Sequence, residues 1–304
     1  FGDDDVTAST AQVKNAGIHT QTVNLSGAAA NNYQVGNVSV TVGKFTLTVN
    51  QSGTLTYNGA LQTVSLSMDK FGNDDVSAST DQVKNAGSYS QDVTLSGDDK
   101  DNYQVLAQVE IEVKPYTLNL SQVSTPTYNG AAQQIDFNAD FRGNDATQGW
   151  TTYVMMTNVG TTNMTVEHTI PSGSVGNYII PTVSPTMTPK TLTVNQNGTM
   201  TYNGALQNVP LTIIGVEGTD EVTASTAQVK NAGSYSQAVN LSGAAANNYQ
   251  VGNVSITVGK FTLTVNQSGT LTYNGSLQTV SLSINKFGDD DVTASTAQVK
   301  NAGI

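Results

Sequence analysis

Apolar and polar residues alternate over short stretches of the chain. In FTLTV (Phe45–Val49) and VEIEV (Val109–Val113) every second residue is apolar, as in a strand with one buried face. Further short apolar stretches lie between these two, at residues 55–57, 63–68, 76–79, 89–95 and 103–105. No convincing helical period interrupts them. The pattern therefore predicts about seven short strands between residues 44 and 113.

Turn-forming residues separate the predicted strands. Asn58-Gly59 follows Leu55–Tyr57, and Asn-Gly is typical of tight hairpin turns because both residues tolerate positive φ angles. The stretches KFGND, KNAG and GDDKDN separate other strands. The sequence thus predicts small all-β domains, most simply Ig-like antiparallel β-sandwiches. A β-grasp-like sheet with one helix is the alternative.

The same motifs recur along the chain, as in repeat proteins. TYNG begins at Thr56, Thr127, Thr201 and Thr272, and QVKNAG begins at Gln12, Gln82, Gln228 and Gln298. An Asn-Tyr pair begins at Asn32, Asn102, Asn177 and Asn248. A lysine precedes each Thr- and Leu-rich stretch, at Lys44, Lys114, Lys190 and Lys260, with steps of 70, 76 and 70 residues. The chain is therefore predicted to be a tandem array.

The lysine spacing predicts five segments. These are the back half of a repeat (1–43), a complete repeat (44–113), a divergent complete repeat (114–189), a complete repeat (190–259) and the front half of a repeat (260–304). The first eighteen residues, Phe1–Ile18, are identical to Phe287–Ile304, so we expect the chain to be a window of a longer array. Domains of this size bury a small core, and we expect them to support one another along a rod.

Composition limits the possible partners. Only 12% of residues are charged, the net charge is -11, and no basic patch is visible, which makes nucleic acid a poor partner. No apolar run is long enough to insert into a membrane. The absence of cysteine excludes disulfides and thiolate metal sites.

The repeat unit resembles a known family. It reads K-x-L-T-V, YNGALQ, GNDDV, VKNAGSYSQDVTLSG and DNYQV, and it is similar to the YDG and MBG-type tandem repeat domains of bacterial surface proteins and adhesins. Asn58 stands where that family usually has Asp. The resemblance implies an extracellular β-domain protein of the cell surface that serves as a stalk, adhesin or filament. It supplies no catalytic residues.

Acidic turns are candidate calcium sites, because calcium takes six to eight oxygen ligands from loops. The candidate ligands are Asp74, Asp75, Asp98, Asp99 and Asp101. Gly-Asp-Asp is also ordinary turn chemistry, and the sister loop Gly27–Asn32 lacks the acids. Calcium is the one cofactor that the sequence suggests.

Catalysis is not expected. The two histidines, His19 and His168, lie in no Ser-His-Asp arrangement, and the paired carboxylates recur in turns rather than in one cleft.

The divergent repeat differs in composition from its neighbours. It holds the only Trp, the only Arg and four of the six Met. Such residue types are enriched at interfaces, and the candidate interface residues are Arg142, Trp150, Met155 and Met156. A repacked core is the alternative explanation.

These observations favour a structural surface protein, a filament or adhesin stalk that associates with neighbouring repeats or with itself. One alternative is a binding module in which the divergent repeat recognises a glycan or a host protein. Another is a subunit that polymerises by strand complementation between residues 1–43 and 260–304. Low-charge edges such as Tyr33–Val42 favour pairing with another chain.

Overall fold

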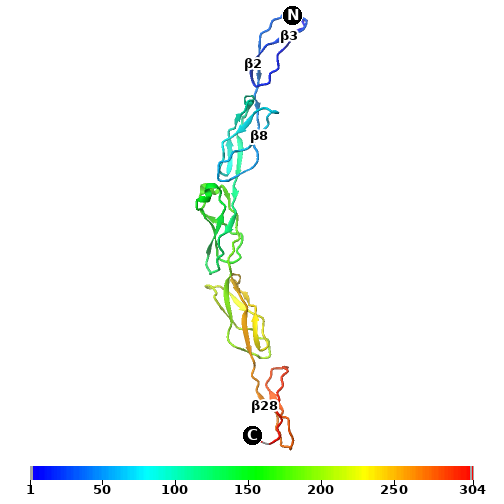
Figure 1. Ribbon diagram of the computed structural model, residues 1–304, viewed down its shortest axis with the longest axis vertical. Coiled ribbons are helices and arrows are strands. Elements are labelled where there is room, and N and C mark those ends of the chain that lie inside the picture. The colour runs from blue at the N-terminus through cyan, green and yellow to red at the C-terminus, as the bar shows by residue number, and fades with distance from the viewer. Residues whose placement is uncertain (1–2, 302, 304) are drawn as a thin grey trace. The chain divides into compact units, whose positions relative to one another are not determined.

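The computed structural model describes residues 3–301 and 303, and nearly all of its regular structure is β (Figure 1). The chain forms two compact units. The first unit runs up to Ser121 and includes Phe137–Tyr153 and Thr165–Thr182; the second comprises Gln122–Asp136, Val154–Met164 and the chain from Val183 onward. The five segments expected from the lysine spacing remain a prediction. Phe1, Gly2, Ala302 and Ile304, which belong to the identical ends, lie outside the described residues.

The first unit consists of short strands. They are β1 (Thr7–Ser9), β2 (Gly17–Gln21), β3 (Asn24–Ser26), β4 (Val38–Val42), β5 (Phe45–Thr46), β6 (Val49–Gln51), β7 (Leu55–Thr56), β8 (Leu66–Met68), β9 (Ser77–Ser79), β10 (Gly87–Gln91), β11 (Thr94–Ser96), β12 (Tyr103–Gln104), β13 (Val109–Lys114), β14 (Tyr116–Thr117), β18 (Glu167–His168) and β19 (Tyr178–Ile179). Its helical segments are η1 (Ala30–Asn32), η2 (Lys100–Asn102), η3 (Gly143–Thr147) and α1 (Ser172–Val175).

The second unit has the same character. Its strands are β20 (Lys190–Gln196), β21 (Met200–Thr201), β22 (Leu211–Ile214), β23 (Thr223–Ser225), β24 (Gly233–Gln237), β25 (Asn240–Ser242), β26 (Tyr249–Val251), β27 (Val254–Gly259), β28 (Val265–Gln267) and β29 (Leu282–Ile284), with η4 at Ala246–Asn248. The remaining strands, β15 (Leu120–Gln122), β16 (Gln133–Ala139) and β17 (Thr152–Met156), contain residues of both units.

Strand pairing joins the start of each repeat to its end. In the repeat 44–113, β10 and β13 are antiparallel, with Tyr89 opposite Ile111. The pairs β6–β8 and β9–β11 are also antiparallel. Two pairs are parallel: β5 with β12, where Phe45 faces Tyr103, and β7 with β13. The repeat 190–259 has the same parallel links, β20–β26 and β21–β27.

Small apolar cores lie between these sheets. One contains Val64, Val83, Val109, Ile111 and Val113, and its counterpart in the second unit contains Val194, Met200, Val229, Val254, Ile256 and Val258. The alternation in VEIEV is the reason: its apolar residues are buried and its two glutamates are exposed.

The all-β fold built of small antiparallel sheets is confirmed. The described helical segments contain three to five residues. In the repeats 44–113 and 190–259 the helical segments are single 3-10 turns of three residues, η2 and η4. A β-grasp domain needs a longer helix, so the β-grasp alternative is not favoured. Among the described residues, no helix is long and apolar enough to cross a membrane.

One local prediction was wrong. Asn58-Gly59 does not close a hairpin between neighbouring strands, because β7 before it pairs in parallel with β13. Gly59 has a φ of 81°. Among the described residues, Asn163 is the only one other than glycine with a positive φ, so Asn58 does not have one. A type I′ hairpin turn needs positive φ at both central positions. Asn58 instead accepts the Ala60 N–H through its side chain.

Candidate functional site: the repeat junctions

Successive repeats are joined by contacts between recurring motifs. We call these contacts the first, second, third and fourth junctions, centred on Asn102, Asn177, Asn248 and Asp290 in that order. The first two lie within the first unit, and the last two lie within the second unit.

The asparagine of each Asn-Tyr pair binds a turn of the preceding repeat. Asn102 Oδ1 accepts the Ala16 N–H, and Asn177 Oδ1 accepts the Ala86 N–H, each at 2.8 Å. Asn248 Oδ1 accepts the Val159 N–H at the same distance. A buried N–H without a partner costs free energy, so one repeat satisfies a backbone donor of another.

The tyrosine of TYNG binds an aspartate of the next repeat. Tyr57 Oη donates to Asp145 at 2.6 Å, and Tyr128 Oη donates to Asp220 at 2.7 Å. At the fourth junction the donor is Tyr202 and the acceptor is Asp290, at 2.7 Å. Hydrogen bonds to a charged acceptor are stronger than neutral ones.

The tyrosine of the Asn-Tyr pair donates to the same aspartate. Tyr178 Oη is 2.7 Å from Asp145, and Tyr249 Oη is 2.5 Å from Asp220. The two rings at each site meet edge to face, with centroids 5.3 Å apart for Tyr57 with Tyr178. One carboxylate therefore unites two tyrosines from neighbouring repeats at the second and third junctions.

Burial extends the pH range over which these tyrosines stay neutral. Desolvation raises the pKa of Tyr57 to about 12, and the hydrogen bond to Asp145 acts in the same direction. Desolvation likewise raises the pKa of Tyr128 and Tyr178, with Asp220 and Asp145 contributing. The Tyr57 hydroxyl consequently remains a donor above pH 10.0, where an ordinary tyrosine begins to ionise.

The glycine of TYNG allows the close approach of the next repeat. A Cβ on Gly59 would lie 2.6 Å from the carbonyl oxygen of Arg142, and one on Gly204 would lie 2.6 Å from Cβ of Phe287. Both glycines have positive φ, 81° and 78°. A larger residue here would meet both a strained backbone and a steric clash.

The predicted calcium ligands make protein contacts instead of forming one cluster. Asp74 accepts the Tyr103 hydroxyl at 2.6 Å, which lowers the pKa of Asp74, and pairs with Lys14 at 3.5 Å. Asp75 N–H donates to Asp99 Oδ2 at 2.9 Å.

Further contacts join the turn that contains Asp75 to the turn that contains Asp98 and Asp101. The Asp98 N–H donates to Asp75 Oδ2 at 3.2 Å, and Asp101 lies in the short turn η2. Within residues 3–301 and 303, no group of three or more histidine, cysteine, aspartate or glutamate side chains has metal-binding geometry. Calcium binding stays a prediction, and turn formation accounts for the contacts that these carboxylates make.

The predicted interface residues occupy different environments. The Arg142 guanidinium stacks 3.8 Å over the ring of Tyr116, and Trp150 packs edge to face on Phe141 in the core around Tyr57. Met156 is 0% exposed and Met155 is 48% exposed, as neighbours on one strand alternate. Whether they bind a partner stays a prediction.

The junctions between repeats were not predicted from the sequence. Their signal was present, because TYNG, KNAG and Asn-Tyr are the motifs that recur most clearly. From its residue types, each motif predicts a turn within its own repeat. The structure shows that these turns contact the turns of the neighbouring repeat.

No protein-family model matches the chain, and no curated protein matches it. A solved structure of FdeC, described as a broadly conserved Escherichia coli adhesin that elicits protection against urinary tract infections, has 12% sequence identity and a TM-score of 0.20. The match covers 70% of this chain and 96% of that chain. A TM-score this low supports no inference about fold or function.

Proposed function

We propose that this chain is a structural tandem-repeat protein of the bacterial cell exterior, a stalk or filament segment without catalysis. The observation that supports the proposal is the recurrence of the junction. The asparagine and the tyrosine-aspartate bonds occur together at the second and third junctions, while the first junction has the asparagine bond and the fourth has the tyrosine-aspartate bond. A contact that is repeated between successive repeats favours a structural role of the whole chain over a single catalytic or binding site.

The junction chemistry suits that role. The repeats 44–113 and 114–189 each depend on the following repeat for a backbone hydrogen-bond acceptor and for a carboxylate partner. In tandem-repeat proteins stability is a sum of the repeat's own contribution and of its interfaces. Small domains without disulfides therefore gain stability from their place in the array.

The extracellular location is inferred from the resemblance of the repeat to YDG and MBG-type domains of bacterial surface proteins. Antibody labelling of the producing bacterium tests it. We expect label on intact cells, and loss of that label when protease is added outside. A cytoplasmic protein, which is labelled only after the cells are permeabilised, serves as the control. If this chain is also labelled only after permeabilisation, the proposal is contradicted.

A further inference from the structure

The repeats 44–113 and 190–259 each hold their beginning against their end through parallel strand pairs. In the first of them these pairs are β5 with β12 and β7 with β13. Beside the first pair the Leu47 N–H donates to Gln104 O, and beside the second the Tyr57 N–H donates to Lys114 O, each at 2.8 Å. Two bonded regions therefore join the start of the repeat to its end.

A glutamine side chain joins the same two parts of the chain between the strand pairs. We call these parts the entry segment, residues 45–57, and the exit segment, residues 103–114. The Gln51 side chain accepts the Glu112 N–H through Oε1 at 2.7 Å and donates to Glu112 O through Nε2 at 3.1 Å. The backbone of β6, which contains Gln51, pairs with β8. The side-chain amide therefore makes the two hydrogen bonds to β13 that a neighbouring strand would make.

The same arrangement recurs in the other interior repeats. In the repeat 190–259, Gln196 makes the two bonds to the backbone of Thr257, at 2.7 and 3.1 Å. In the divergent repeat, Gln122 makes them to the backbone of Thr186, both at 2.8 Å. The bound residue is a glutamate in one repeat and a threonine in the other two. The glutamine is therefore the side chain that the three contacts share, and we call each contact a glutamine clasp.

The direction in which the chain enters and leaves a repeat decides how these bonds respond to pulling. The chain enters the repeat at β5 and leaves it after β13. Tension along the chain pulls the entry segment toward the preceding repeat and the exit segment toward the following one. Because β5–β12 and β7–β13 are parallel, this motion slides one strand along the other. The hydrogen bonds run between the strands, so they are strained together instead of breaking one after another.

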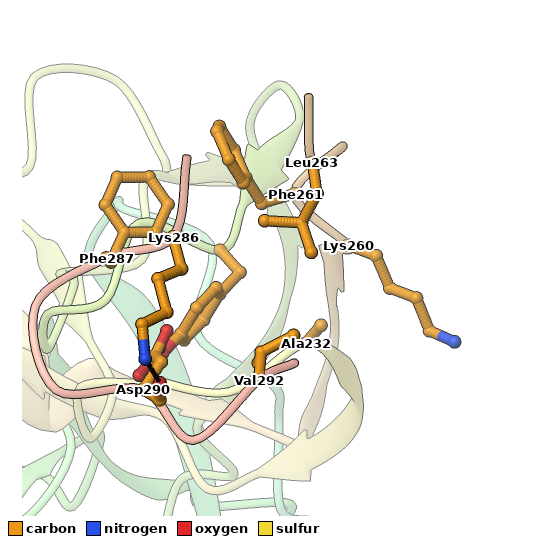
Figure 2. Close-up of a pocket in the computed structure, with 9 residues that line it drawn as sticks. Ala232, Lys260, Phe261, Leu263, Lys286, Phe287, Asp290 and Val292 are labelled. Carbon is orange, nitrogen blue, oxygen red and sulfur yellow. Dashed lines mark hydrogen bonds between the residues drawn. The ribbon is translucent and has the colours of Figure 1, made fainter. Parts of the chain in front are cut away.

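The second unit shows how the chain leaves a repeat. β27 ends at Gly259, whose carbonyl oxygen accepts the Tyr202 N–H at 2.9 Å. Figure 2 shows Lys260, Phe261 and Leu263 on the segment that continues from β27. In its sheet β27 lies between β21 and β24. Tension on the chain after β27 is therefore applied to the strand that β21 holds in parallel.

We propose that the parallel strand pairs and the glutamine clasp form a mechanical clamp, by which each complete repeat resists tension along the chain. The apolar cores of the repeats are small, and apolar burial has no preferred direction. The clamp opposes the one motion that pulling on the chain produces. This inference deepens the proposed function and rests on it for the source of the tension, because a stalk or filament segment is pulled along its length.

Pulling the full chain in two directions tests the clamp. The chain has no cysteine, so two introduced cysteines give defined attachment points. Lys44→Cys with Lys114→Cys, both at exposed positions, pulls the repeat 44–113 along the chain. Ser88→Cys with Lys114→Cys pulls β10 from β13 at one end of their antiparallel pair. Since β13 lies between β10 and β7, this second direction does not load the clamp.

We expect the repeat to withstand a clearly higher force along the chain than across β10 and β13. In the second direction the bonds of the antiparallel pair break singly from the pulled end. This comparison uses chains in which the clasp is intact, so it does not depend on the folding of a clasp variant.

Removal of one clasp tests the part played by the glutamine. At a constant force along the chain, Gln51→Ala is expected to raise the unfolding rate about tenfold, because two hydrogen bonds are lost. In the second pulling direction the same substitution is expected to leave the unfolding rate unchanged.

Gln108 provides a matched control. Its side chain also makes two hydrogen bonds, with Ser90 Oγ at 2.8 Å and Asp92 Oδ1 at 3.0 Å. These bonds join the region of β10 to the residue before β13, and they do not link the entry segment to the exit segment. Gln108→Ala is therefore expected to change the unfolding rate along the chain by less than about twofold.

Three outcomes would overturn the proposal. One is an equal unfolding force in the two directions. Another is an unfolding rate along the chain that Gln51→Ala does not raise. The third is a Gln51→Ala effect of the same size in both directions, which would indicate general stability instead of a clamp. These measurements use the purified chain, so they stand whether or not intact cells are labelled, and the labelling result stands whether or not the clamp exists.

Discussion

Asp145 shows how one residue joins two repeats. Its Oδ2 accepts hydroxyl hydrogen bonds from Tyr57 and Tyr178, and both tyrosines are nearly buried. Ionisation of either tyrosine would place a second negative charge beside the carboxylate. The junction should therefore be sensitive to alkaline pH and to loss of a single hydroxyl.

Alkaline pH is expected to destabilise the chain through Tyr57. The pKa of Tyr57 is raised from 10.0 to about 12, so the stability that it contributes is fully present below pH 10.0 and is lost as pH rises toward 12. Thermal melting across this range measures the loss. The Tyr57→Phe variant should be less stable at neutral pH by about 1 kcal/mol and should lose less between pH 10.0 and 12. Equal alkaline losses in both proteins would refute this role of Tyr57.

Substitution of Gly59 tests whether the close approach of the next repeat matters, and Gly53 provides a matched control. Gly53 and Gly59 have φ angles of 83° and 81°, but a Cβ on Gly53 would meet nothing within 4 Å, whereas one on Gly59 would clash with the Arg142 carbonyl. Gly53→Ala should cost about 1 kcal/mol from backbone strain alone. We expect Gly59→Ala to cost clearly more in chemical unfolding, and equal costs would show that the contact is unimportant.

At the scale of elements, the sequence predicted strands better than their partners. The alternation in VEIEV gave β13 almost to the residue, since a half-buried strand has a strict period of two. FTLTV was predicted as one strand, but the structure divides it into β5 and β6. Parallel pairing of β5 with β12 depends on contacts nearly sixty residues apart, which no local pattern encodes.

The junctions were unpredictable for a related reason. KNAG and Asn-Tyr are turn signals within one repeat, and the hydrogen bond between Ala86 and Asn177 spans 91 residues. The acidic turns suggested calcium, because Asp-rich loops have the right atoms for it. In the structure Asp74 and Asp75 bond to tyrosine, lysine and backbone donors, and calcium binding stays a prediction.

Removal of one junction asparagine should be costly. Asn177→Ala leaves the Ala86 N–H without its acceptor, and we expect a loss of about 1–3 kcal/mol in the free energy of unfolding. Denaturant titration measures it. Asn208→Ala, at an exposed site away from the junction, serves as the control and should change stability by less than about 0.5 kcal/mol. A similar small effect in both variants would mean that the junction bond is not structural.

At the scale of the whole molecule, the same short motifs recur along the chain. Each compact unit contains two junctions, and the apolar cores are small; one of them contains Tyr57 of one repeat together with Leu118 and Tyr178 of the next. The central claim is that the chain consists of repeats of about 70 residues that fold as units and are joined in series.

Single-molecule stretching of the full chain tests that claim most directly. We expect successive unfolding events for the three complete repeats, each releasing about 70 residues, or a gain of at most roughly 250 Å of extended chain. The Asn177→Ala variant should lower the force of the events that border the second junction. Two large events, each releasing an entire compact unit, or extension without distinct events, would contradict the account.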